Sequence, residues 1–184
     1  MNIMKNRFLK KCLIYALMTA IIVVQKLLLA VIPNFQFSTL LLILFFYVFG
    51  TKPMLLITLL YVIVDNLWLG TFHIIYTPVM FIAWSSLLLI LIPFRKRNNN
   101  FWILGLLGVV HAVVYSFCFG FATAMLHEID IIAYIIADIP FTLILMVSNF
   151  LTIIWLFPPL YKTMSKYYKI IMVENDCKEE EKML

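Results

Sequence analysis

Charge is scarce in this chain. Asp, Glu, Lys and Arg together make up 12% of its 184 residues, whereas hydrophobic residues make up 65%. The mean hydropathy is +1.05. A water-soluble fold could not cover so much apolar surface with so few charged side chains. The composition therefore excludes a soluble globular protein and predicts an integral membrane protein that acts within or across a bilayer.

Sequence motifs of catalysis and nucleotide binding are also missing. The chain contains no GxSxG turn, no HExxH zinc pair, no CxxC pair and no phosphate-binding GxxxxGK[ST] loop. Its three cysteines, Cys12, Cys118 and Cys177, are far apart and have neither metal-binding nor redox spacing, so we expect free thiols. We expect no metal and no other cofactor. If ATP powers the protein, the ATPase must be a different chain.

Six apolar stretches separated by short turns fill most of the chain, near residues 12–32, 37–50, 54–71, 74–93, 101–120 and 131–157. They are continuously apolar, as membrane helices are, and lack the alternation of transmembrane β-strands. We predict an all-α bundle of six transmembrane helices over residues 1–169. Pro158 and Pro159 are expected to end the sixth helix, and residues 170–184 are predicted to be a disordered cytoplasmic tail.

The basic residues indicate how the bundle is oriented. They lie before the first stretch, between the second and third, between the fourth and fifth, and after the sixth, as do Lys10, Lys52, Arg95 and Lys162. With six spans these positions share one side, which the positive-inside rule makes cytoplasmic. Both termini are therefore predicted to be cytoplasmic. The first stretch lacks a small-x-small cleavage site, so we expect it to be retained.

Polar and aromatic side chains recur on single faces of the predicted helices: Asp65 and Trp68 on the third, Trp84 on the fourth, His111 and Tyr115 on the fifth, and Asp138 and Thr142 on the sixth. Unpaired polar groups are costly in lipid, so those that persist there are usually functional. These faces could converge on a cavity that opens to the outside, with the composition of a small-molecule site. Alternatively, the polar groups bond to one another and hold the helices together, for instance Lys26 with Asp65.

Small residues mark two helix faces. Ala16 and Ala20 lie one turn apart on the first helix, a spacing that lets another helix approach closely. The spacing leaves open whether that helix belongs to a partner chain or to this bundle, or whether the two alanines fall there by chance in a span that tolerates alanine. Gly105, Gly108 and Ala112 form a similar strip on the fifth helix, and there we favour packing within the bundle.

This combination of features resembles the substrate-binding S components of energy-coupling-factor (ECF) vitamin transporters. The resemblance is carried by residues 16–20 (ALMTA), 29–41 (LAVIPNFQFSTLL), 138–141 (DIPF) and 148–150 (SNF), and it covers residues 1–169. It implies a bacterial plasma-membrane protein that captures a vitamin or related micronutrient from outside. The chain would then dock on a membrane T component that carries two ATPase subunits.

The resemblance also implies roles for particular residues. Ala16 and Ala20 would form the docking face, and Asn34 and Gln36 would belong to a lid over the pocket. The pocket would draw on the fourth to sixth helices, which makes Trp84, His111, Tyr115 and Asp138 candidates for substrate binding.

The charges constrain the ligand, because acids outnumber bases at the outer end and Lys26 is the only cation near it. A neutral or cationic molecule with a ring suits such a site better than a polyanion does. Two other functions stay open. A small membrane enzyme could use His111 and Asp138 as an acid–base pair on a lipid. An accessory membrane subunit would use the polar residues only to lock helices together.

Overall fold

The computed structural model describes residues 2–68, 70, 73–95 and 100–180, with side chains described between residues 8 and 171. These residues form α-helices and one short 3-10 helix, and no β-strand occurs among them. The α-helices are α1 (Asn2–Leu28), α2 (Ser38–Phe49), α3 (Thr51–Trp68), α4 (Tyr76–Leu91), α5 (Phe101–His127) and α6 (Ile131–Glu180), and the 3-10 helix is η1 (Ile92–Phe94). The all-α class predicted from the sequence is confirmed.

Five helical segments in the described part of the chain are long and apolar enough to cross a membrane: Phe8–Leu28, Thr51–Trp68, Tyr76–Phe94, Phe101–His127 and Ile131–Ile171. They are what a multi-pass membrane protein requires. The remaining apolar helix, α2, has 12 residues. At 1.5 Å per residue it is about 18 Å long, against a hydrocarbon core of about 30 Å. The prediction of six complete spans therefore holds by length for five.

The short helix α2 lies inside the bundle. Leu42, Ile43 and Phe46 are fully buried, and α2 contacts α1, α3, α4 and α6. The other helices pack in sequence around it: α1 on α3, α3 on α4, α4 on α5 and α5 on α6. Because α2 meets protein on most of its surface, its length does not have to match the thickness of the lipid.

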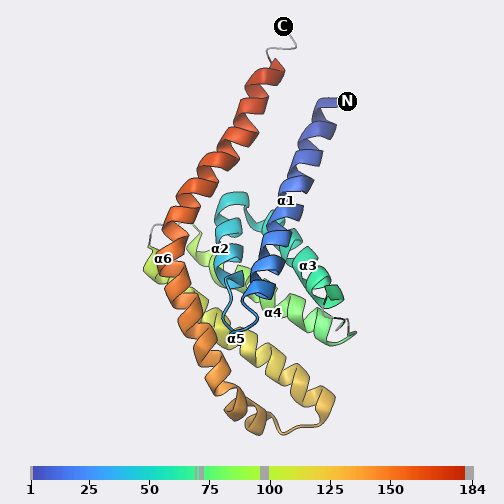
Figure 1. Ribbon diagram of the computed structural model, residues 1–184, viewed down its shortest axis with the longest axis vertical. Helices are drawn as coiled ribbons and strands as arrows, with labels where there is room; N and C mark the ends of the chain where they lie inside the picture. The colour runs from blue at the N-terminus through green and yellow to red at the C-terminus, as the bar shows by residue number, and fades with distance from the viewer. Residues whose placement is uncertain (1, 69, 71–72, 96–99, 181–184) are drawn as a thin grey trace.

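The start of α1 and the end of α6 point toward one end of the molecule, and the turn between α5 and α6 lies at the opposite end (Figure 1). We call the end with the α5–α6 turn the distal end. The shared end of the two termini fits the predicted orientation, in which the distal end faces outward. That assignment to sides of a membrane stays a prediction.

Helix α6 differs from its predicted form. It runs without interruption from Ile131 to Glu180, through Pro158 and Pro159. The prediction that these prolines end the helix was wrong, since each proline removes one backbone donor and packing compensates for that loss. Phe157 and Tyr161 stack on each other at 5.5 Å and both contact the Tyr47 ring of α2. Residues 170–180, predicted as a disordered tail, continue the helix, and residues 181–184 lie outside the described residues.

The small-residue strip of α5 lies against α6, as predicted. A Cβ added at Gly105 would come within 3.1 Å of the Phe150 ring, and one at Gly108 within 2.5 Å of Ile153 Cδ1. Asn149 Nδ2 donates to Gly108 O at 3.0 Å in the same buried contact. The missing side chains therefore set how closely α5 and α6 approach, and a cavity between these two helices, described below, depends on that approach.

Candidate functional site

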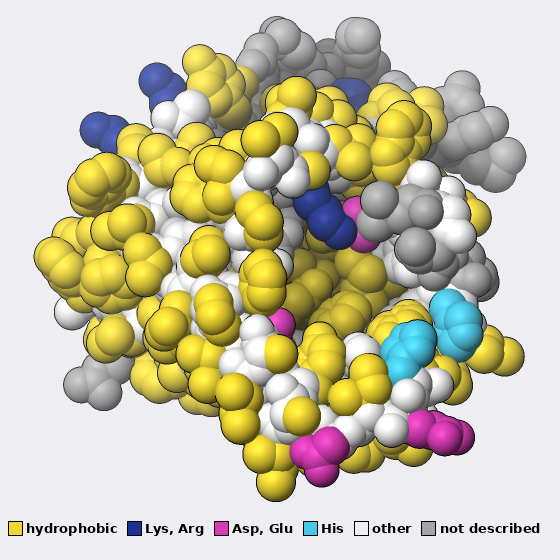
Figure 2. All heavy atoms as spheres, turned by 60° about the horizontal axis from the view of Figure 1, so that its bottom comes forward, with side chains coloured by type: hydrophobic (Ala, Val, Ile, Leu, Met, Phe, Trp, Pro, Cys, Tyr) yellow, Lys and Arg dark blue, Asp and Glu magenta, His cyan; other side chains and the backbone are white. Residues whose placement is uncertain are grey.

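Three adjoining cavities lie at the distal end, and Tyr115 lines all of them. The α6 cavity, about 200 Å³, lies between α5 and α6 and includes Asp138. The α3 cavity, about 270 Å³, includes Lys26 and Asp65. The loop cavity, about 230 Å³, lies against the segment between α1 and α2. Figure 2 views the distal end and shows a hollow with hydrophobic side chains deep inside it.

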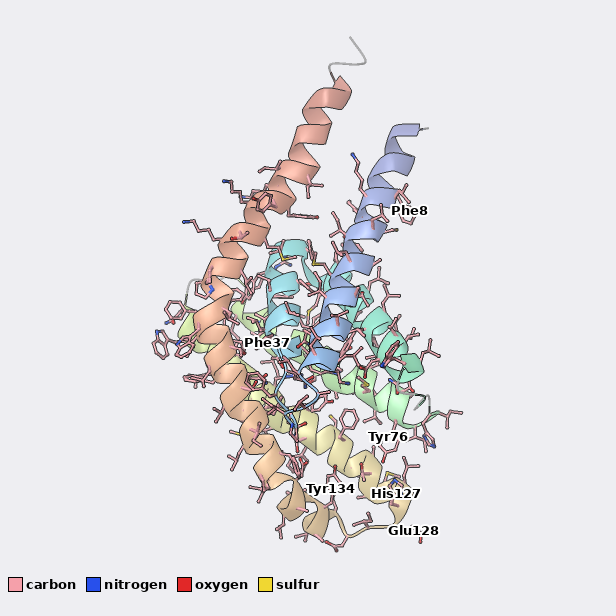
Figure 3. The ribbon with its side chains drawn as sticks, viewed as in Figure 1. Phe8, Phe37, Tyr76, His127, Glu128 and Tyr134 are labelled. Carbon is pink, nitrogen blue, oxygen red and sulfur yellow. The ribbon has the colours of Figure 1, made fainter. Side chains whose placement is uncertain are left out.

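Aromatic side chains of α5 separate the α6 cavity from the α3 cavity. Tyr115 and Phe119 are one helical turn apart, their ring centroids lie 4.7 Å from each other, and both line both cavities. Tyr134, near the start of α6 (Figure 3), adds a third ring to the α6 cavity. Gly120 makes room for it, since a Cβ there would lie 3.1 Å from the Tyr134 ring. A flat ligand in the α6 cavity would therefore meet aromatic surfaces from two helices.

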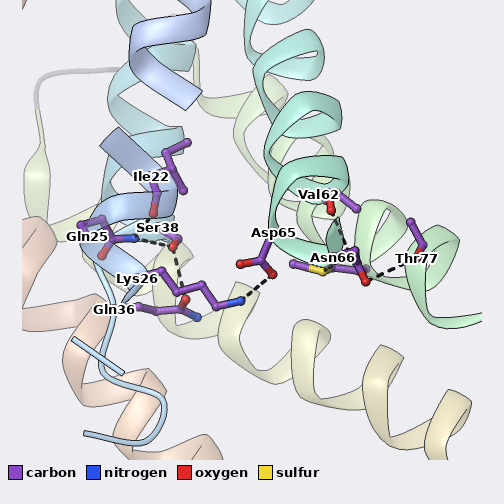
Figure 4. A network of polar contacts seen from close by, with 10 residues as sticks. Ile22, Gln25, Lys26, Gln36, Ser38, Val62, Asp65, Asn66 and Thr77 are labelled. Atoms are coloured by element: carbon purple, nitrogen blue, oxygen red, sulfur yellow. Dashed lines mark hydrogen bonds and ion pairs between the residues drawn. The ribbon is translucent and has the colours of Figure 1, made fainter. Parts of the chain in front are cut away.

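The segment between α1 and α2 is fastened to α1 by Gln25. The Gln25 Nε2 donates to Ser38 Oγ at 2.8 Å, and the Gln25 Oε1 accepts from Phe37 N at 2.9 Å. Ser38 Oγ donates to Gln36 Oε1 at 3.2 Å, as Figure 4 shows. Gln36 is buried and lines the loop cavity, whereas Asn34 is exposed and lines both the loop cavity and the α6 cavity. The segment thus covers part of the hollow.

Replacing Gln25 with leucine removes the hydrogen bonds to Phe37 N and Ser38 Oγ and keeps the side chain's approximate size. We expect faster backbone hydrogen exchange over residues 36–40 and a loss of about 1–3 kcal/mol in the free energy of unfolding, because buried polar partners lose their bonds. Hydrogen-exchange mass spectrometry checks this. Thr19→Val is the matched control, since the Thr19 hydroxyl bonds only within α1, to Tyr15 O. Equal exchange in both variants would contradict the prediction.

An ion pair joins α1 to α3 at the α3 cavity. Lys26 Nζ lies 2.7 Å from Asp65 Oδ2, as Figure 4 shows, and the side chains are 29% and 3% exposed. Lys26 Nζ also lies 6.0 Å from the centroid of the Tyr61 ring. The Lys26–Asp65 pair, which the sequence suggested as an example of polar groups that hold helices together, is therefore present. Its charges cancel, so it adds polarity to the wall of the hollow without adding net charge.

Asp138 lies in the α6 cavity with two hydroxyl groups beside it. The Ser116 Oγ of α5 donates to Asp138 Oδ2. The Thr142 Oγ1, one turn along α6, lies 2.8 Å from both Asp138 Oδ2 and Ser116 Oγ. Hydroxyl groups replace part of the hydration that a carboxylate loses in a membrane. All three residues line the cavity, so this hydrogen-bonded cluster faces the space a ligand would occupy.

Trp84 and His111 lie behind Tyr115. Each is 1% exposed, and the Trp84 ring centroid is 5.0 Å from that of Tyr115 and 5.5 Å from that of His111. His111 Nε2 lies 3.2 Å from Ala83 O. Trp84 Nε1 and His111 Nδ1 have no hydrogen-bond partner among the described residues. These two predicted site residues line none of the three cavities and instead support the ring of Tyr115.

The structure brings together most of the residues that the sequence predicted for the site. The six that line the cavities are Asn34, Gln36, Asp65, Tyr115, Asp138 and Thr142. Trp68 is different: it is the last residue of α3, it is 69% exposed, and it lines none of the three cavities. Its position on the Asp65 face of α3 does not bring it to the hollow, because Trp68 lies almost one turn nearer the end of the helix than Asp65.

Besides the apolar Leu145, sequence reasoning missed three polar or aromatic residues of the α6 cavity: Ser116, Phe119 and Tyr134. A signal existed for two of them, because Phe119 is four residues after Tyr115 and Tyr134 is four residues before Asp138. Residues at that spacing share a helix face. Ser116 gave no such signal, since its contact with Asp138 depends on how α5 and α6 pack.

The Ala16 and Ala20 positions are exposed on α1, and only 17% of the most apolar window of Phe8–Leu28 is buried. Packing within this bundle therefore does not use the Ala-x-x-x-Ala face. Of the alternatives left by the sequence, the exposure argues against packing within the described bundle, and a docking face for a partner stays a prediction.

Potential metal ligands do not cluster at the distal end. Within the described residues, no three His, Cys, Asp or Glu side chains are placed to share a metal ion. The groups available to a ligand include the Asp138 carboxylate with the hydroxyls of Ser116 and Thr142, the Lys26–Asp65 ion pair, and the aromatic rings around Tyr115. Groups of these kinds can bind and orient a small molecule. Comparison of the chain with protein-family models, curated proteins and solved structures finds no match.

Proposed function

We propose that the chain is the substrate-capturing membrane subunit of an ECF-type importer of a vitamin or related small molecule. The observation that carries the proposal is the hollow at the distal end, which is lined by aromatic rings and polar groups and is partly covered by the α1–α2 segment fastened through Gln25. The exposed Ala16 face supports it further, because an ATP-driven importer needs a surface on which the capturing subunit meets its partner.

The proposed cycle assigns a task to each part of the chain. A ligand enters the hollow from outside when the α1–α2 segment moves aside, and it is held among Tyr115, Asp138 and Asp65. The subunit docks through Ala16 and Ala20 on a T component bearing two ATPase subunits, since the chain has no phosphate-binding loop of its own. ATP hydrolysis in those partners reorients the bundle and opens the hollow to the cytoplasm.

Co-purification tests the proposal. The chain is co-expressed with the T component and two ATPases of the same organism, and a stoichiometric complex is expected. Ala16→Trp should abolish that complex, because a large ring prevents close approach of helices at a small-residue face. Ala137→Trp is the matched control, since Ala137 is exposed on α6 and has no part in the docking face. Absence of a complex with the unmodified chain, or equal loss in both variants, would refute the assignment.

The two alternative functions make different demands. An enzyme using His111 and Asp138 as an acid–base pair needs them within hydrogen-bond reach. Here His111 contacts Ala83 O, and Asp138 contacts Ser116 and Thr142. An accessory subunit needs no cavity, and it predicts unimpaired function after combined His111→Ala and Asp138→Ala replacement. The lined hollow favours the substrate-capturing subunit over both.

A further inference from the structure

The charged side chains of the hollow do not balance. Among the described residues that line the three cavities, the acidic and basic side chains are Lys26, Asp65 and Asp138. Lys26 and Asp65 neutralise each other at 2.7 Å. Asp138 has no Lys, Arg or His nitrogen within salt-bridge distance in the described part of the chain, and its partners are the neutral hydroxyls of Ser116 and Thr142. The hollow therefore contains one acidic side chain, Asp138, without a cationic partner among the described residues.

An uncompensated carboxylate between membrane helices is costly, and a cation from outside the chain is the natural partner for it. The hydroxyls of Ser116 and Thr142 both lie at the Oδ2 atom. They hold the carboxylate in a fixed orientation, and they bring no positive charge that would compete with a ligand. Asp138 is therefore positioned to form an ion pair with a cation that enters the cavity.

The aromatic residues of the same cavity favour the same class of ligand. Tyr115, Phe119 and Tyr134 all line the α6 cavity together with Asp138. The face of an aromatic ring attracts a cation, and more strongly when the pair is removed from water. It also stacks on flat rings. A negatively charged ligand would be repelled by the carboxylate, and a neutral one would leave it unpaired.

We propose that the α6 cavity selects an organic cation, with an ammonium or amidinium group on Asp138 and a flat ring on Tyr115 and Phe119. The proposal rests on the proposed function as a substrate-capturing subunit, and it narrows the substrate class of that site to molecules with a single positive charge. The Lys26–Asp65 pair lines the α3 cavity, on the other side of the Tyr115–Phe119 partition, and does not line the α6 cavity.

Binding of a matched ring series tests the charge selection. The purified chain in lipid nanodiscs is titrated calorimetrically with 2-phenylethylamine, 2-phenylethanol and 3-phenylpropanoate, which differ in charge and little in shape, and empty nanodiscs give the partitioning background. The amine is expected to bind about tenfold or more tighter than the alcohol, the factor that corresponds to one favourable cation contact. The propanoate is expected not to bind. No binding of the amine at millimolar concentration overturns the proposal, as does equal binding of all three compounds.

Two variants locate the selectivity. Asp138→Asn keeps an acceptor for Ser116 and Thr142, and it should erase the tenfold preference for the amine while the thermal unfolding midpoint stays near that of the unmodified chain. Glu128→Gln is the matched control, since it removes an exposed acid at the α5–α6 turn (Figure 3) and should leave the preference intact. Phe119→Leu should weaken the amine and the alcohol by similar factors. A preference that survives in Asp138→Asn, or falls equally in Glu128→Gln, overturns the assignment to Asp138.

The outcome separates this proposal from the importer assignment. Selective amine binding without a T-component complex would leave the cation site standing and remove the transport role. A stoichiometric complex together with binding of only the alcohol or the propanoate would support the importer assignment and overturn the cation site.

Discussion

Replacing Lys26 with methionine is expected to lower the free energy of unfolding by about 3–5 kcal/mol, the cost of leaving one member of a buried ion pair without its partner. The remaining Asp65 carboxylate is 3% exposed, so water in the α3 cavity replaces the ammonium group only in part. Methionine keeps the length and apolar stem of the side chain, so the loss reports the charge. Thermal and denaturant unfolding of the purified chain in detergent measure it.

The converse replacement should cost less. Asp65→Asn leaves a lysine that is 29% exposed, whose long chain can turn the ammonium group toward the polar opening of the hollow. Combining Lys26→Met with Asp65→Asn removes both charges and should recover most of the loss seen in Lys26→Met alone. A double variant as unstable as the single one would show that the lysine stem, and not the charge pair, stabilises the contact between α1 and α3.

The helices could be predicted from the sequence because continuous apolar runs have few other structures available in lipid. Their ends were less predictable. Pro158 and Pro159 are local signals for a helix end, and the rings of Phe157 and Tyr161 on Tyr47 outweigh them. The short span of α2 has another cause, since its burial among four helices comes from tertiary packing that hydropathy does not encode.

The candidate site also contains residues that could be placed from the sequence and residues that could not. Helical spacing was sufficient to place Asp138 and Thr142 together, because both belong to one face of α6. It could not place Ser116 against Asp138, since that contact crosses from α5 to α6. Spacing also could not distinguish Tyr115, which lines the α6, α3 and loop cavities, from His111, one turn earlier on the same face and buried behind it. Depth along a helix decides between a lining and a supporting residue, and depth depends on how neighbouring helices tilt.

The approach of α5 to α6 gives the second large expected effect. Gly108→Leu should destabilise the chain by about 3 kcal/mol, the upper end of the usual cost of overpacking. A Cβ at Gly108 already falls 2.5 Å from Ile153 Cδ1 and 3.4 Å from Asn149 Cβ. A leucine must therefore push the helices apart and strain the hydrogen bond from Asn149 Nδ2 to Gly108 O. Thermal unfolding in detergent measures the loss, and Val110→Leu, at an exposed position of α5, is the matched control.

A double-mutant cycle tests whether the contact with Ile153 Cδ1 causes the loss of stability. Gly108→Ala adds only the Cβ, and Ile153→Val removes only the Cδ1 that this Cβ would strike. Ile153→Val alone should cost about 0.5–1.5 kcal/mol, because a buried methyl group is lost. In the presence of Gly108→Ala the same replacement should cost clearly less, since the added methyl fills the space that the valine leaves. Strictly additive losses would mean that α5 and α6 do not meet at these two atoms, and the walls of the α6 cavity that depend on this contact would have to be placed differently.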